Sequence, residues 1–271
     1  MTPPTTADID PHEIIAAVRL GMAAIVGQKA AVQVEYKLDD SPVTVADRAA
    51  EKAITNHLEA RFQAPIIAEE RFCEGRIPDV GAVFFLVDAL DGTKSYIAGK
   101  PDYTVNIAVI ENGVPVFGCV GVPETGAVYY GGLGLEPVLE LGGRTTKLAV
   151  RTAGAALDVV ASRNHLSGPT RTYLEGLGVA RMKLVGSSLK ICLIAEGKAD
   201  LYPRFGRTMQ WDTAAGDAVL RASGGRMVTP AGKPLVYGRT HRPGEDVFAN
   251  GFFVALGDPA LLKRKGIITG S

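Results

Sequence analysis

The chain has few cysteines, no excess charge of either sign and no long uninterrupted apolar run. Its three cysteines, Cys73, Cys119 and Cys192, stand far apart and form no CxxC pair. This usage argues against a disulfide framework or a cysteine-based zinc site and suits a reducing compartment. Lysine plus arginine equals aspartate plus glutamate at 29 each. We therefore expect no general attraction to nucleic acid or membranes, and any anion-binding site must be local.

Several motifs of common enzyme classes are also missing. The chain has four histidines but no HExxH, and it has no Gly-x-Ser-x-Gly elbow or Walker loop. A serine hydrolase or a nucleoside-triphosphatase therefore has little support, and a histidine-rich zinc site has none. The polar, acidic start does not resemble a signal peptide, and the apolar stretch at 14–26 is interrupted by Arg19 and too short to span a bilayer. We expect a cytoplasmic protein without stable membrane insertion.

The rest of the sequence is typical of a globular protein with mixed secondary structure. Hydrophobic residues make up 46% and charged residues 21%, which allows a well-buried core. Apolar spacing predicts helices at 11–31 and 46–62, and the pattern at 103–132 predicts a β-meander. A glycine- and threonine-rich stretch at 133–155 predicts a boundary, and strands alternate with helices after it. We therefore predict a layered α/β architecture in two halves, 1–150 and 151–271.

The strongest local feature is the segment VDALDGT at 87–93. A buried strand delivers two carboxylates, Asp88 and Asp91, at its end, where α/β enzymes tend to place ligands. Proteins hold Mg²⁺ by a few carboxylates together with water and substrate phosphate. The amides of Gly92 and Thr93, opening a short helix, could hold a phosphate. On spacing alone, the segment is explained equally well if both aspartates are turn and cap residues and not metal ligands.

Three further groups of polar residues lie at element boundaries. Glu69 and Glu70 follow the short strand PIIA, and adjacent acids there are costly unless they are solvated or bound to cations. Asp212, in WDTAAG, opens a predicted helix, and Thr44 with Asp47 precedes another. Taken one at a time, a solvated loop start and ordinary helix caps explain these residues better than a site does.

The order and spacing of these motifs are more specific than any one of them. EE, then DxLDGT, then WDxAAG resembles the inositol monophosphatase superfamily of metal-dependent, lithium-sensitive phosphatases, from SPVTVAD to the final strands. The resemblance implies a layered αβαβα sandwich of the sugar-phosphatase type. Within the superfamily, VDALDGTKSYI, SRNH and GSSLKICLIAEGKADLYPRFGRTMQWDTAAGDAV look most like the 3′(2′),5′-bisphosphate nucleotidase branch of the CysQ type.

The resemblance implies a magnesium-dependent phosphomonoesterase acting on a small phosphorylated nucleotide. The expected reaction is hydrolysis of 3′-phosphoadenosine 5′-phosphate, or its sulfated form 3′-phosphoadenosine 5′-phosphosulfate, in sulfur metabolism. Two alternatives stay open among phosphatases, namely an inositol monophosphatase and a fructose-1,6-bisphosphatase-like sugar phosphatase. A nucleotide sensor without catalysis is the alternative from another class. The resemblance is also compatible with a homodimer, because dimers are common among the relatives.

The resemblance assigns roles to individual residues. The expected ligands of two or three Mg²⁺ ions are the side chains of Glu69, Asp88, Asp91 and Asp212 and the backbone carbonyl of Leu90. The expected catalytic residues are Asp47 and Thr93, which orient and deprotonate the attacking water, and Glu70, which supports the metal ligands. The expected substrate contacts are the Gly92 and Thr93 amides on the scissile phosphate, Ser187, Lys190 and Arg204 on the nucleotide and its second phosphate, His165 beside the base or ribose, and Asp212.

One residue departs from the family pattern. Ala89 stands where the family usually has proline. Proline would fix φ and stiffen the loop that carries Asp88 and Asp91. Alanine keeps both ligands but loosens their geometry, so the departure bears on metal affinity.

Overall fold

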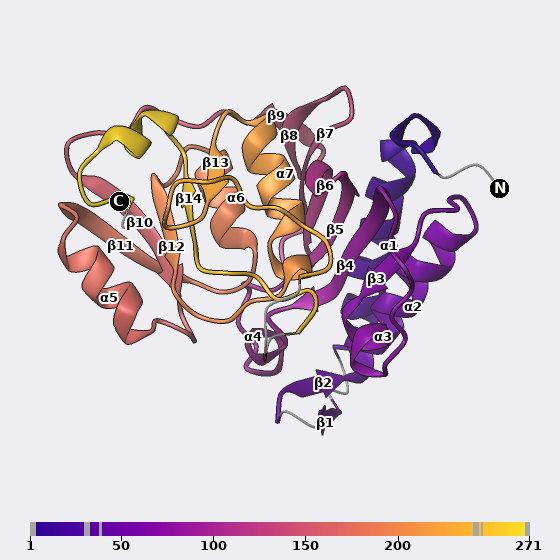
Figure 1. Ribbon diagram of the computed structural model, residues 1–271. Coiled ribbons are helices and arrows are strands. Elements are labelled where there is room, and N and C mark those ends of the chain that lie inside the picture. The colour runs from indigo at the N-terminus through magenta and orange to yellow at the C-terminus, as the bar shows by residue number, and fades with distance from the viewer. Residues whose placement is uncertain (1–3, 30–32, 38–39, 241–243, 245, 269–271) are drawn as a thin grey trace.

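The computed structural model describes residues 4–29, 33–37, 40–240, 244 and 246–268. These residues form two large β-sheets with helices between them and on both outer faces (Figure 1). A short 3₁₀ helix η1 (Thr6–Asp8) comes first, and a small hairpin of β1 (Val34–Tyr36) and β2 (Pro42–Thr44) lies at the edge of the molecule.

The first large sheet has seven strands that follow one another in sequence order. They are β3 (Ile66–Ala68), β4 (Val83–Asp91), β5 (Thr104–Glu111), β6 (Val114–Val122), β7 (Ala127–Gly132), β8 (Leu135–Leu141) and β9 (Arg144–Lys147). Only the β3–β4 pair is parallel in this sheet, and the remaining neighbours are antiparallel. The predicted meander is therefore confirmed. The boundary predicted at 133–155 is wrong in its first part, because β8 and β9 extend the same sheet there.

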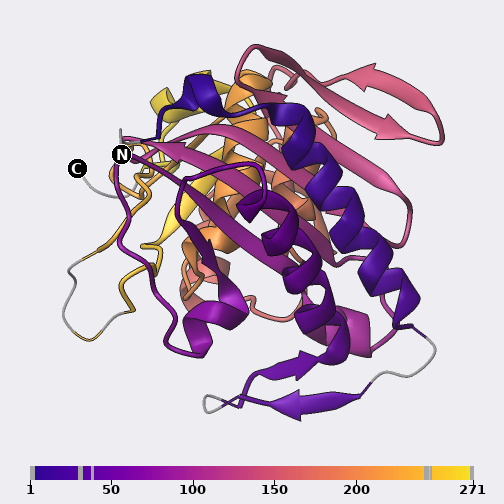
Figure 2. The same ribbon diagram turned by 90° about the vertical axis from the view of Figure 1, so that its right-hand side faces the viewer.

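Two long helices cover one face of this sheet. They are α1 (Pro11–Gly27) and α2 (Val45–Glu59), which run side by side in Figure 2. The side chain of Asp10 caps α1 and Pro11 occupies its first turn, where a proline needs no hydrogen-bond acceptor. Both helices are shorter than predicted, ending at Gly27 and Glu59. Their apolar stripes pack with the sheet in one buried cluster.

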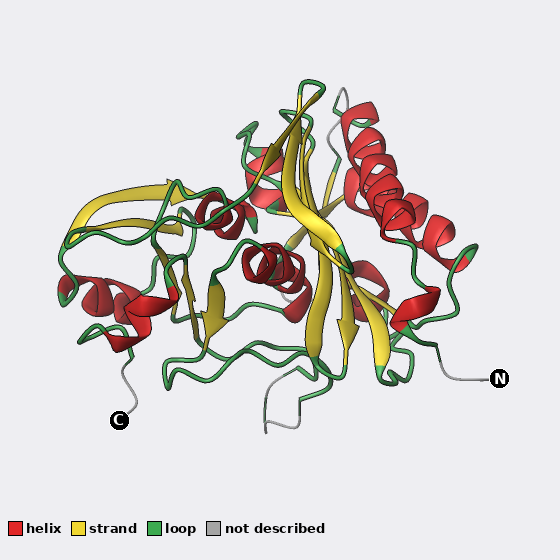
Figure 3. Cartoon of the chain, turned by 90° about the horizontal axis from the view of Figure 1, so that it is seen from above, coloured by secondary structure: helices red, strands yellow, loops and turns green. Residues whose placement is uncertain are grey.

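The second sheet has five strands in the order β11-β10-β12-β14-β13. Their bounds are β10 (Leu157–Ser162), β11 (Val179–Val185), β12 (Leu201–Arg204), β13 (Arg226–Val228) and β14 (Phe253–Leu256). β10 is parallel to both neighbours, and β14 is antiparallel to both of its neighbours. Helices α6 (Leu189–Ala195) and α7 (Ala214–Ala222) fill the space between the two sheets (Figure 3), and α5 (Gly168–Glu175) and the 3₁₀ helix η3 (Pro259–Lys263) cover the outer face.

Three buried clusters hold these layers together: one lies between α1, α2 and the first sheet, one surrounds α6 and α7 and joins both sheets, and one lies between the second sheet and the outer helices. The layers alternate as helix, sheet, helix, sheet and helix, which confirms the predicted layered fold. The division at 150/151 stays a prediction, and the central cluster joins side chains from both halves, such as Leu86 and Val219. Among the described residues, none of the helices is both long and apolar enough to span a membrane.

Candidate active site

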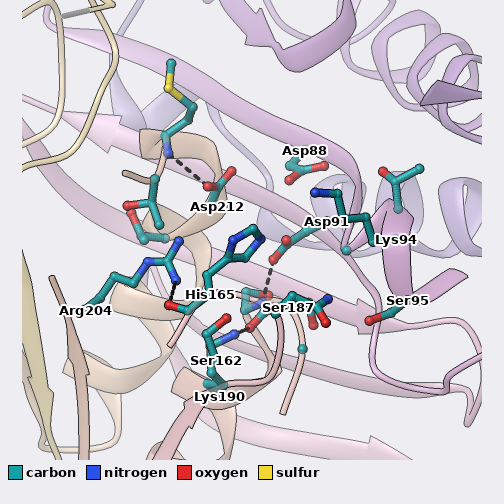
Figure 4. A pocket seen from close by; sticks show the side chains of 18 of the residues that line it. Asp88, Asp91, Lys94, Ser95, Ser162, His165, Ser187, Lys190, Arg204 and Asp212 are labelled. Atoms are coloured by element: carbon teal, nitrogen blue, oxygen red, sulfur yellow. Dashed lines mark hydrogen bonds between the residues drawn. The ribbon is translucent and has the colours of Figure 1, made fainter. Parts of the chain in front are cut away.

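A cavity of about 640 Å³ opens where the end of β4 meets the start of α6 and the 3₁₀ turn η2 (Gln210–Asp212). It brings together most of the residues predicted for the site. Figure 4 shows Asp88, Asp91 and Asp212 near one another, with Arg204, His165 and Lys190 to one side of them and Lys94 beside Asp91. The predicted residues that line it are Glu69, Asp88, Leu90, Asp91, Gly92, Thr93, His165, Ser187, Lys190, Arg204 and Asp212. Asp47 and Glu70 lie behind this wall, bonded to Thr93 and to Lys37.

Three acids from distant segments converge in the cavity. One carboxylate oxygen each from Glu69, Asp88 and Asp212 lies within 4.8 Å of the others. Burial, followed by the charges of the neighbouring acids, raises the pKa values of Asp88 and Asp212 well above the usual range. Such a cluster is costly without a cation, and its oxygen ligands are those that Mg²⁺ prefers. The donor set therefore fits a hard divalent ion.

Asp91 lies beside this group and is turned partly away from it. Its Oδ2 accepts a hydrogen bond from the Ser188 amide, and burial raises its pKa while the charge of Lys190 opposes the rise. An irregularity in the β4–β5 register separates Asp88, which pairs with Asn106, from Asp91, which pairs with Thr104. This break in the ladder lets one strand end present two carboxylates to the same cavity.

The turn after Asp91 requires a glycine. Gly92 has φ of 92° and stands directly before α4 (Thr93–Ile97), as predicted for a short helix start. A Cβ atom at this position would lie 3.3 Å from the carbonyl oxygen of Asp102, in a backbone region that L side chains rarely adopt. Gly92 and Thr93 both line the cavity.

The Asp47 carboxylate serves both as a helix cap and as a partner of the cavity residue Thr93, which were alternative interpretations of the sequence. The Thr44 amide and hydroxyl donate to its Oδ2 at 2.7 and 2.6 Å, which forms the capping box of α2. The Thr93 hydroxyl donates to its Oδ1 at 2.9 Å. Burial raises the pKa of Asp47. The cap and the Thr93 contact therefore coexist, and Thr93 connects the cavity to a buried carboxylate.

Glu69 and Glu70 form the first turn of α3 (Glu69–Cys73), so the solvated loop start is the wrong interpretation of this pair. Lys37 Nζ lies 2.7 Å from a carboxylate oxygen of each. Burial and the charge of Glu69 raise the pKa of Glu70 to about 7. Sequence reasoning missed Lys37, because a single lysine in a polar stretch gives no sign of its partners.

Asp212 does not open the following helix as predicted. It ends η2, its carboxylate accepts from the Met209 amide at 2.9 Å, and α7 begins later at Ala214. The 3₁₀ turn accounts for the difference, because the Asp212 carboxylate binds back to the residue before this turn and does not cap the helix that follows. Asp212 nevertheless reaches the acid group from the second half of the chain.

Lys190 and Arg204 are buried, so the alternative that they are solvated surface charges is wrong. Lys190 is 5% exposed, and its Nζ donates to the Ser187 carbonyl and lies 5.1 Å from the centre of the Tyr202 ring. Burial lowers the pKa of Lys190 to about 8. A buried ammonium with N–H groups to spare is costly unless an anion binds to it.

Arg204 is held by backbone carbonyls rather than by acids. Its Nη1 donates to the His165 carbonyl at 3.1 Å and its Nη2 donates to the Arg207 carbonyl at 2.8 Å. Within the part of the chain that the structure describes, nothing accepts a hydrogen bond from its buried Nε. The guanidinium is therefore fixed in direction while its charge remains uncompensated by a carboxylate contact, which suits an anionic ligand.

Asn106 and Ser188 are further residues of the site that the sequence did not predict. The Ser188 hydroxyl donates to Asn106 Oδ1 at 2.6 Å, and Asn106 Nδ2 donates weakly to Asp91 at 3.4 Å. Asn106 is fully buried in a strand that is apolar apart from Asn106 and its two end residues, Thr104 and Glu111. A lone amide in such a run was the available signal, because buried polar groups need partners.

The family of the chain follows from comparison with known proteins. Residues 10–250 match the inositol monophosphatase family. The chain belongs to this family. The 3′(2′),5′-bisphosphate nucleotidase CysQ of Escherichia coli K12 is 41% identical over 226 residues, covering 83% of the chain and 89% of that protein. The same enzyme of Salmonella typhimurium is 42% identical over 221 residues, covering 81% and 87%.

Solved structures of family members support the same fold. The crystal structure of CysQ from Bacteroides thetaiotaomicron matches with a TM-score of 0.75 and 33% identity, covering 91% of the chain and 96% of that structure. An inositol monophosphatase from Thermotoga maritima matches with a TM-score of 0.74 at 22% identity, covering 93% of each chain. The chain is therefore a phosphatase of the inositol monophosphatase family.

Proposed function

We propose that the chain is a Mg²⁺-dependent 3′(2′),5′-bisphosphate nucleotidase that hydrolyses 3′-phosphoadenosine 5′-phosphate, and its sulfated form, in sulfur metabolism. The observation that carries the proposal is the placement of buried Lys190 and Arg204 in the same cavity as the acid cluster. A substrate with two phosphates would place the phosphate to be cleaved at the acid cluster and the second phosphate at Lys190 and Arg204. The names of the CysQ relatives agree with this substrate.

Two or three Mg²⁺ ions would be held by carboxylates from both halves of the chain. The residues that fit are Glu69, Asp88, Asp91 and Asp212, with the carbonyl of Leu90. When bound, Mg²⁺ supplies positive charge that activates water and stabilises the leaving oxygen. Asp88 is central to this set, since Glu69, Asp91 and Asp212 all raise its pKa by their charge. Glu70 with Lys37 supports Glu69 from behind.

Thr93 and Asp47 would position the attacking water and accept its proton. The Thr93 hydroxyl lines the cavity and donates to Asp47 Oδ1, so its oxygen remains available as an acceptor towards the cavity. A proton leaving the water can thus pass through the Thr93 hydroxyl to a carboxylate that burial makes more basic than usual. The amides of Gly92 and Thr93 would hold the scissile phosphate during this step.

Lys190 and Arg204 would bind the phosphate that is not cleaved, with Ser187 beside them. Lys190 offers a point charge and Arg204 a planar guanidinium whose direction is set by two carbonyls. His165, whose carbonyl accepts from Arg204, lines the same wall and would lie beside the base or the ribose. An inositol phosphate carries no second phosphate for these cations.

The test is phosphate release from 3′-phosphoadenosine 5′-phosphate and from inositol 1-phosphate, measured side by side with Mg²⁺, with EDTA and with added Li⁺. We expect strong preference for the nucleotide, loss of activity in EDTA and inhibition by Li⁺. Preference for inositol 1-phosphate would keep the metal site and overturn the nucleotide assignment. Phosphate release that persists in EDTA would overturn the metal assignment.

A further inference from the structure

Glu51 is a buried acid that lies outside the set of ligands and catalytic residues. It belongs to α2, is 5% exposed and directs its carboxylate at the start of α3. Its Oε2 accepts a hydrogen bond from the Glu70 amide at 2.7 Å, and its Oε1 accepts from the Arg71 amide at 3.1 Å. Both carboxylate oxygens are therefore engaged by the backbone of one short helix.

The helix α3 has a physical need for this contact. It is only five residues long, and such short helices are not stable by themselves in water. The first amides of a helix have no partner within it, and a side-chain oxygen normally caps them. Ala68, the residue before α3, has a methyl side chain and cannot do so. Glu51 provides from α2 the acceptors that a local cap would provide.

The same helix carries two acids of the site. Glu69 joins Asp88 and Asp212 in the converging group, and Glu70 is bonded with Glu69 to Lys37. The orientation of the first turn of α3 therefore sets where the Glu69 carboxylate points. Glu69 lies on α3 and Asp88 lies on β4. A small rotation of the first turn of α3 would therefore move the Glu69 carboxylate away from Asp88.

We propose that Glu51 is a positioning residue, which fixes the first turn of α3 so that Glu69 is held in the geometry that a divalent cation requires. This inference rests on the proposed metal site. Outer partners that orient metal ligands typically change metal affinity by about 10- to 100-fold when they are altered. Glu51 acts here on the backbone of the ligand segment rather than on a ligand side chain.

The test compares Glu51→Gln with the matched control Glu59→Gln. An amide has one acceptor oxygen, and its NH₂ group faces a second N–H donor, so Glu51→Gln leaves one buried amide of α3 without a partner. Glu59 also lies on α2 and also contacts Arg71, but through an ion pair of side chains with Glu59 half exposed. The control therefore removes a contact between the same two helices without touching the α3 amides.

Direct Mn²⁺ binding, measured by the electron paramagnetic resonance signal of the free ion, is the first readout. For Glu51→Gln we expect the dissociation constant for Mn²⁺ and the activation constant for Mg²⁺ to rise about tenfold or more. The KM for substrate at saturating Mg²⁺ should stay within about twofold, because α3 carries neither Lys190 nor Arg204. Glu59→Gln should behave like the wild type in both measurements.

Unchanged Mn²⁺ binding by folded Glu51→Gln would overturn the inference, as would an equal loss in Glu59→Gln. If Glu51→Gln does not fold, Glu51→Asp replaces it, because the shorter side chain cannot reach both amides. Weaker Mn²⁺ binding by Glu51→Asp supports the inference, and unchanged binding refutes it. A wild type that binds Mn²⁺ but releases no phosphate refutes the proposed function alone. A wild type that binds no Mn²⁺ refutes both.

Discussion

The pKa of Glu70 predicts that the metal-free protein loses stability as the pH rises from 5 to 7. Burial, and then the charge of Glu69, raise the pKa of Glu70 from its ordinary value of 4.5 to about 7, and the side chain is 12% exposed. In this interval the folded chain keeps a proton that the unfolded chain has released. The free energy of unfolding must then fall as the pH rises, and the loss is complete above about pH 7.

The size of the effect follows from the same two pKa values. The difference between 4.5 and about 7 corresponds to about 3 kcal/mol of unfolding free energy. Lys37, which contacts Glu70, stays charged throughout, because Glu69 and Glu70 raise its pKa although burial opposes this. Glu70→Gln removes the titrating group. Other titrating groups, such as His165, contribute the same pH dependence of stability to the wild type and to this variant. Part of this loss has occurred by pH 5, so between pH 5 and pH 8 the wild type should lose about 2.5 kcal/mol more than this variant.

The measurement is chemical unfolding in EDTA at pH 5 and pH 8, followed by fluorescence of Trp211, which is the single tryptophan and is buried. Glu74→Gln is the matched control, because Glu74 is exposed and forms its ion pair with Arg76 in the same loop. It should keep the pH dependence of the wild type. Added Mg²⁺ should reduce that dependence. Equal pH dependence of the wild type and Glu70→Gln would refute the reasoning.

Four further substitutions test the site itself. Asp91→Asn should lower turnover roughly 100-fold or more without unfolding the chain, since it removes a charge facing the metal site; a near-normal rate would show that Asp91 is no ligand. Lys190→Ala and Arg204→Ala should each raise the KM for 3′-phosphoadenosine 5′-phosphate about tenfold or more and spare inositol 1-phosphate; equal effects on both substrates would contradict the second-phosphate role. Ala89→Pro should lower the Mg²⁺ activation constant about two- to fivefold by stiffening the irregular end of β4 that carries Asp88 and Asp91, and a higher constant would contradict this.

Residues at the ends of apolar runs could be predicted because each carries a local signal. The strand β4 is a continuous apolar run, so Asp88 and Asp91 stand out where it ends. Gly92 follows them and marks the turn. The layered fold was predictable for the same reason, because strand and helix patterns alternate after the meander. Local patterns of this kind depend on neighbours within a few positions.

Contacts between elements gave no such signal. Lys37 meets Glu69 and Glu70 only because the β1–β2 hairpin folds over the start of α3. Glu51 reaches α3 only because α2 packs beside it. A helical pattern predicts that a residue is buried, but its partner depends on how two helices are placed, which no single segment encodes.

The segments that carry the predicted metal ligands are also joined to each other by residues outside the predicted ligand set. Phe72, on α3, packs its ring 5.1 Å from that of Trp211, whose neighbour is Asp212. Asn106, on β5, accepts from the hydroxyl of Ser188, whose amide donates to Asp91. The segments that carry Glu69 and Asp212, from different halves of the chain, are thus linked by an aromatic contact, in addition to the ion pair of Glu69 with Lys37. Because carboxylates repel one another without a cation, these neutral contacts, together with Lys37, must keep the acids in place before the ions bind.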